Sequence, residues 1–240
     1  MRGISPRFGL LIFILLVSGH LAAQKGLSSS TDQQLLAHRY KKSIGVQSGI
    51  INGRDYLGYE PVGDEHPYFE EDEWATGSVV YDNIVYDSVE LRYDLEKDVL
   101  VYEHDFNGQM VQLVSDKVNS FRLRGHTFEF LNFKKGDFTF EGFYDLIYSG
   151  RSKAYVKRTK SFQKRYSSTT YDPNFTEKNN YYIFLKSDAY RIGTMSDLVK
   201  ALGLYGTEAR KLVRKQHLNF KRNPDQVIGI MLGYYDQQTR

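Results

Sequence analysis

Residues 89–95 read VELRYDL, an alternation of apolar and charged side chains. In an extended chain, Val89, Leu91, Tyr93 and Leu95 fall on one face, and the three charged residues between them fall on the other. This period of two predicts an antiparallel strand with one buried face and one solvated face.

The same pattern continues on both sides of this strand. From residue 77 to residue 192, short apolar and aromatic runs are separated by turn signals such as Asn107-Gly108 and Ser149-Gly150. Turns that recur roughly every 8–12 residues are typical of a meander in a sandwich or barrel. The chain also holds 19 Tyr and 15 Phe, residues that favour pleated and half-buried surfaces.

The C-terminal region changes to a period of 3.6. Thr194 or Ser196 can cap a helix that ends at Gly203, Thr207 can cap a second, and residues 223–225 (Asn-Pro-Asp) start a third. We therefore expect a mainly β (α+β) fold: an antiparallel β-meander that forms a sandwich or a partly open barrel, with a small C-terminal helical cluster.

The N-terminal residues predict export. Arg2 and Arg7 precede an apolar run over residues 8–17, and small residues follow up to Ala23. This is the pattern of a secretory signal peptide, and the run is shorter than the roughly 20 residues that span a bilayer. We expect a mature chain without a transmembrane segment that is periplasmic, outer-membrane-associated or extracellular.

These patterns divide the chain into four parts. Residues 1–23 are the signal peptide, 24–76 an arm with wrapping loops, 77–192 the antiparallel β domain, and 193–240 helices packed on that domain. Within the β domain, the polar stretch 160–178 is expected to be a long exposed loop.

Composition excludes several function classes. The chain has no cysteine, which excludes thiolate zinc sites, cysteine catalysis and a lipid-modified cysteine. Removal of two arginines with the leader leaves 32 − 2 = 30 basic residues against 29 acidic ones. A nearly neutral chain gives no general reason to expect nucleic acid as a partner.

The chain lacks the short motifs that identify common enzymes. It contains no Gly-x-Ser-x-Gly elbow and no phosphate-binding glycine loop, and His66, His104 and His126 lack metal-ligand spacing. We therefore assign no catalytic residue, no metal ligand and no cofactor, and whether the chain is an enzyme stays open, with the balance against it. Two carboxylates from distant strands can form a glycosidase site that sequence does not reveal.

One local charge feature suggests a ligand site. The basic residues and the tyrosine that we select for it are Arg151, Lys153, Tyr155, Lys157 and Arg158. Such a run can bind an anionic glycan or a lipid head group, whereas the alternative, which we favour, is an edge strand whose lysines block edge-to-edge aggregation.

Several stretches resemble a group of uncharacterised exported β-rich proteins of diderm bacteria. They are residues 40–45, 77–83, 93–95, 142–144, 148–150 and 157–160. The resemblance implies export and a β-rich architecture, and it carries no known activity and no site residue.

Together these observations predict a secreted or periplasmic non-enzymatic protein with a binding or structural role. Its expected partner is a protein or an amphipathic or anionic ligand of the cell envelope, and the sequence does not indicate its oligomeric state. The alternative is a hydrolase that acts on glycan or peptide through an unrecognised carboxylate or His-carboxylate site.

Overall fold

The computed structural model describes residues 50, 53–59, 65–104, 108–166, 171–204 and 206–239. The predicted signal peptide and much of the predicted arm lie outside these residues. The chain divides into two compact units, Met1–Tyr40 and Lys41–Arg240, and every described residue belongs to the second.

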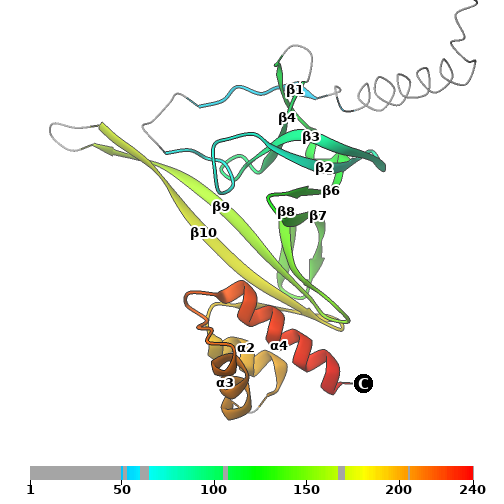
Figure 1. Cartoon of the computed structure of the whole chain (residues 1–240), viewed down its shortest axis with the longest axis vertical. Coiled ribbons are helices and arrows are strands. Elements are labelled where there is room, and N and C mark those ends of the chain that lie inside the picture. The colour runs from blue at the N-terminus through cyan, green and yellow to red at the C-terminus, as the bar shows by residue number, and fades with distance from the viewer. Residues whose placement is uncertain are drawn as a thin grey trace, which may run out of the picture. The chain divides into compact units, whose positions relative to one another are not determined.

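Eleven described strands form one antiparallel sheet (Figure 1). They are β1 (Arg54–Asp55), β2 (Ala75–Tyr81), β3 (Ile84–Asp94), β4 (Val99–Glu103), β5 (Met110–Gln112), β6 (Val118–Leu123), β7 (His126–Lys135), β8 (Phe138–Ser149), β9 (Lys153–Tyr166), β10 (Tyr171–Leu185) and β11 (Asp188–Ile192), with a 3-10 helix η1 (Ser115–Lys117) before β6. Their order is β1-β5-β4-β3-β2-β6-β7-β8-β9-β10-β11. The expected mainly β class is confirmed, and these strands form a single open sheet with β1 and β11 at its edges, not the two sheets of a sandwich.

The predicted burial of the apolar face of β3 is confirmed. Leu91 and Tyr93 are fully buried, as their shared face requires. Asp94 departs from the pattern because its carboxylate is buried too. Its oxygens accept the hydroxyl of Tyr56 at 2.8 Å and two backbone N–H groups of the following turn at 2.9 Å each, which satisfies the buried charge locally.

The expected loop over residues 160–178 is wrong. β9 continues to Tyr166 and pairs with β10 from Tyr171 onward, so nearly all of this stretch is a two-stranded ribbon. β8 pairs with β9 only between Lys153 and Val156, so the outer ribbon has no third strand. Phe175 is buried in this ribbon and contacts Phe162, but most of the other described residues of the stretch are polar, which explains why the sequence resembled a loop.

The edge-strand interpretation of the basic run is wrong for Lys153–Val156, whereas from Lys157 onward the described residues of β9 do not pair with β8. β9 lies between β8 and β10 and is hydrogen-bonded to both over Lys153–Val156. Its lysines therefore do not protect a free sheet edge there.

The three helices begin and end largely where the sequence predicts. They are α2 (Met195–Leu202), α3 (Gly206–Lys215) and α4 (Pro224–Gln238). Thr194 and Asp197 form a reciprocal capping box at the start of α2, and Gly203 ends it in the left-handed conformation at φ 61°. Among the described residues, no helix combines the length and apolarity that crossing a bilayer requires.

Two buried clusters on the sheet position the candidate site. The first, which we call the sheet core, joins β2, β3, β6, β7 and β8, and includes Val79, Leu91, Tyr93, Phe121, Phe128 and Phe143. The second, the helix–sheet core, packs the helices against β9, β10 and β11, and includes Ala154, Ile183, Ile192, Leu198, Leu202, Val227, Ile228 and Met231. In Figure 1 the three helices gather beside β9 and β10.

Candidate ligand-binding site

The alternation of β9 separates the residues that the sequence grouped into one site. Lys153, Tyr155 and Lys157 lie on one face of the strand, and Arg158 lies on the other, because the pairing with β10 is regular throughout. Arg151 precedes the strand and donates to the carbonyl oxygen of Thr239 at 3.0 Å. The five predicted residues therefore do not form one continuous surface.

The residues on the first face have partners within the protein. Tyr155 donates its hydroxyl to Glu129 at 2.5 Å, and Lys153 lies 3.1 Å from the same hydroxyl oxygen. Lys157 forms an ion pair with Asp98 at 2.5 Å. Their charges are balanced internally, whereas an anionic ligand is best attracted by cations that have no such partner.

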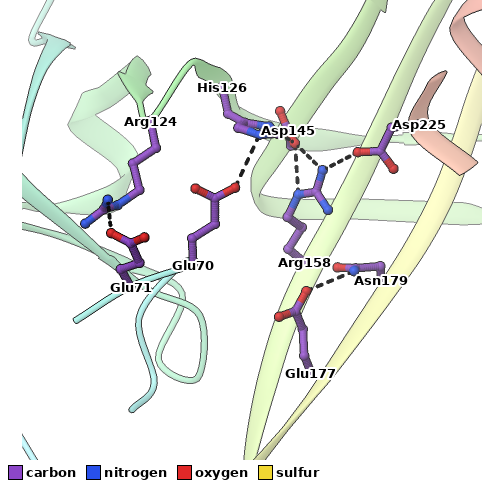
Figure 2. A network of polar contacts seen from close by, with 9 residues as sticks. All are labelled: Glu70, Glu71, Arg124, His126, Asp145, Arg158, Glu177, Asn179 and Asp225. Carbon is purple, nitrogen blue, oxygen red and sulfur yellow. Dashed lines mark hydrogen bonds and ion pairs between the residues drawn. The ribbon is translucent and has the colours of Figure 1, made fainter. Parts of the chain in front are cut away.

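Arg158 belongs to a buried polar network between the two cores (Figure 2). Its Nε and Nη2 donate to Oδ2 of Asp145 at 2.9 and 2.6 Å, and Nη2 also donates to Asp225 at 2.6 Å. The side chains of Arg158 and Asp145 are only 8% and 1% exposed. Asp225 belongs to the first turn of α4, so this network ties the start of that helix to the sheet.

His126 extends the network from the start of β7. Its Nδ1 lies 2.7 Å from Oδ2 of Asp145, and its Nε2 lies 3.6 Å from Oε1 of Glu70, as Figure 2 shows. The hydrogen bond to Asp145 raises the pKa of His126 above its ordinary value of 6.5. The arrangement therefore favours an imidazolium held between two carboxylates.

No pattern in the sequence predicts this network. His66 stacks on Tyr68 and His104 contacts Tyr102, so the three histidines have different surroundings. His126 and Asp145 meet only because β7 and β8 pair, and Glu70 reaches His126 from the segment that precedes β2. Sequence spacing alone does not specify the register between strands.

A pocket of about 720 Å³ opens beside this network, and we call it the seam pocket. It lies between the β7 and β8 ends and α4, and its lining includes His126, Asp145, Leu218, Asp225 and Gly229. One side of the charged network therefore faces a pocket that is large enough for a small ligand.

A second pocket, of about 710 Å³, lies between β10, β11 and the helices, and we call it the β–helix pocket. Its apolar lining residues are Tyr181, Ile192, Met195, Val213, Leu218, Phe220 and Pro224. Its charged lining residues are Arg191, Arg214 and Lys221, and no carboxylate of a described residue lines it. Leu218 lines both pockets, so the two spaces are neighbours.

The β–helix pocket is built from three separate parts of the chain. β10 and β11 supply one wall, the capped start of α2 supplies a second, and the end of α3 with residues 218–221 supplies a third. Its volume lies within the roughly 300–1,000 Å³ typical of small-molecule sites. The three cations are exposed at its surface, while Ile192 and Val213 are buried in its wall.

Metal binding has no support in the described part of the chain. Among those residues, no three histidine or carboxylate side chains come together in a way that could hold a metal ion. Comparison with known proteins adds no assignment: no protein-family model, curated protein or solved structure matches this chain.

Proposed function

We propose that this chain is an exported, non-enzymatic protein that binds a small amphipathic anion in the β–helix pocket. One observation carries the proposal: in the part of the chain that the structure describes, a ligand-sized pocket combines an apolar lining with three cations and no carboxylate. Such a surface suits a molecule with a hydrocarbon tail and a negative head.

The expected energetics follow from the two parts of the lining. Each methylene group that leaves water contributes about 0.8 kcal/mol, which corresponds to about a fourfold gain in affinity. Exposed ion pairs contribute at most about 1 kcal/mol each, so every pocket cation adds up to about fivefold. The tail should therefore determine most of the affinity, and the head should determine specificity.

Calorimetric titration with straight-chain alkanoates, used below their micellisation concentrations, tests the proposal. We expect affinity to rise about fourfold per methylene until the pocket is filled, and to fall when an alkanol of equal length replaces the alkanoate. The double variant R214A/K221A should lose this preference for the anion. K186A, which removes an exposed lysine outside the pocket, is the matched control and should bind as the wild type does.

Two results would contradict the proposal. One is an affinity that does not depend on tail length, because the apolar lining would then be irrelevant. The other is equal binding of alkanoate and alkanol by the wild type, because the three cations would then have no role.

A second candidate function is hydrolysis of glycan or peptide at the His126–Asp145 pair. The observation that favours it is that both residues line the seam pocket, as a base and its orienting carboxylate would. We rank it second because Arg158 already balances Asp145, and the neighbouring carboxylates favour the protonated imidazole, which cannot act as a base. Release of product from chromogenic glycosides or labelled casein by the wild type, and its loss in H126Q, would support hydrolysis.

A further inference from the structure

The end of α3 and the connection to α4 carry an unusual concentration of positive charge. Within residues 209–224 the sequence holds no acidic residue. The exposed cations of this region, which we call the basic patch, are Lys211, Arg214, Lys215, Lys221 and Arg222. On α3, Lys211 lies three and four positions before Arg214 and Lys215, so these three share one face of the helix.

Several cations elsewhere on the described surface form ion pairs, whereas others, such as Lys134, Lys178 and Lys186, do not. Arg92 pairs with Asp72, Lys117 with Asp82, Arg124 with Glu71, Lys153 with Glu129, and Lys157 with Asp98. By contrast, none of the five basic-patch residues forms an ion pair with a residue that the structure describes. Residues 211–222 thus gather five exposed cations with no acidic residue among them, which gives this region a positive potential in a chain that is nearly neutral overall.

The basic patch is continuous with the β–helix pocket. Arg214 and Lys221 belong to both, since each is an exposed cation and also lines the pocket. Half-buried Leu218 and Phe220 lie between them in the sequence and contribute to the apolar lining. Positive charge and an apolar recess thus occupy the same region of the molecule.

We propose that the basic patch docks this protein onto an anionic lipid surface, from which the β–helix pocket takes its amphipathic ligand. The proposal rests on the proposed function, since it names the source of that ligand. A lipid surface offers both negative head groups for the patch and hydrocarbon tails for the pocket. A polynucleotide offers the charge but nothing that an apolar recess of this kind would bind.

The expected strength follows from the number of cations. A Lys or Arg near an anionic membrane surface contributes about a fivefold gain in affinity, and the attraction decays within a Debye length of about 10 Å at 0.1 M salt. Removal of three patch cations should therefore weaken membrane association at least about 100-fold.

Vesicle sedimentation with the full chain tests the docking surface. The vesicles are phosphatidylcholine alone, or phosphatidylcholine with 30% phosphatidylglycerol. The variant K211E/K215E/R222E reverses the three patch charges that do not line the pocket. The matched control, K134E/K178E/K186E, makes the same change in net charge at exposed lysines outside the patch.

We expect the wild type and the control to sediment with phosphatidylglycerol vesicles and not with phosphatidylcholine alone, and the patch variant to stay in solution. Equal loss in both variants would overturn the proposal, because net charge would then explain the binding. So would failure of the wild type to bind, or stronger binding to a single-stranded oligonucleotide than to anionic vesicles.

The vesicle experiment can fail while the test of the proposed function succeeds. The patch variant keeps every residue of the β–helix pocket, so it should bind free alkanoate as the wild type does. If vesicle binding fails while alkanoate binding persists, the docking surface is wrong and the pocket stands. If alkanoate does not bind to either protein, the proposed function itself fails.

Discussion

At the scale of single residues, the most consequential group is Asp145. Its carboxylate is almost completely buried, accepts two hydrogen bonds from Arg158 and lies 2.7 Å from Nδ1 of His126. A buried ion pair adds little net stability, since desolvation offsets the attraction, but the loss of one partner leaves an uncompensated charge. The network is therefore more sensitive to single substitutions than to paired ones.

Replacement of Arg158 by methionine should lower the free energy of unfolding by about 3–5 kcal/mol, because Asp145 would lose its main counter-charge. Urea unfolding at pH 7 measures this loss. The double variant R158M/D145L removes both charges and should recover most of it. A double variant as unstable as the single one would show that packing, and not the unpaired carboxylate, causes the effect.

The stability that His126 contributes should depend on pH. Its pKa is raised in the folded state, so its pairing stabilises the fold fully below pH 6.5, and this contribution disappears as the pH rises through the folded pKa. The difference in unfolding free energy between the wild type and H126Q should accordingly be largest near pH 5.5 and shrink toward pH 8.5. A difference that grows with pH would contradict the assignment, and NMR titration of the imidazole gives the folded pKa directly.

At the scale of elements, β9 shows which parts of the fold could be predicted from the sequence and which could not. The alternation of β3, the cap of α2 and Pro224 at the start of α4 were sufficient to predict those elements, because each depends on residues that are close in the chain. The outer ribbon of β9 and β10 escaped prediction because most of its residues are polar and only Phe162 and Phe175 pack together on one face. The basic run was grouped by sequence proximity, whereas strand alternation places Tyr155 and Arg158 on opposite faces.

The sequence predicts the residue types of the candidate site but not how they come together. The basic helix face and the aromatic residues are visible in the sequence, but the β–helix pocket joins β10, β11, α2 and the residues after α3. That assembly depends on the packing of distant segments. The contact of His126 with Asp145 depends in the same way on the register between β7 and β8.

Gly142 in β8 occupies a position at which a side chain would not fit. It has a φ of +93°, and a Cβ atom there would overlap Oδ2 of Asp98 and lie 2.7 Å from Nζ of Lys157. G142A should therefore destabilise the protein by about 3 kcal/mol, from backbone strain and displacement of this ion pair.

Gly136 provides the matched control for that change. It also has a positive φ, of +60°, but a Cβ atom there would meet nothing within 4 Å. G136A should cost only about 1 kcal/mol of backbone strain in a urea titration. Equal costs at the two glycines would contradict a role for the Asp98–Lys157 contact.

At the scale of the whole molecule, the C-terminal helix is attached to the sheet at both of its ends. Asp225 in its first turn binds Arg158, and Asp236 near its end accepts hydrogen bonds from the backbone N–H and hydroxyl of Ser152 at 3.1 and 2.7 Å. Tyr148 donates to the same carboxylate at 3.0 Å. Between these attachments, the apolar face of α4 packs into the helix–sheet core.

Replacement of Asp236 by alanine should release one end of α4 without unfolding the sheet. Hydrogen exchange followed by mass spectrometry should show faster exchange in the last turns of α4 and near Ser152, while β3 and β4 stay protected. D137A, at an exposed turn, is the control and should change neither region. Faster exchange throughout the sheet would show that the two cores unfold as one unit.

Leu218 has a further consequence, because its side chain borders both recesses and acts as the partition between them. Trimming this partition in L218A should connect the two spaces, so that bulkier or longer hydrocarbons fit and the optimum tail shifts upward by several carbons. The deepened recess would then end at the polar network around Asp225, so that tails with a polar tip would also fit. One leucine would in this way determine both the size and the polarity of the guest that the protein accepts.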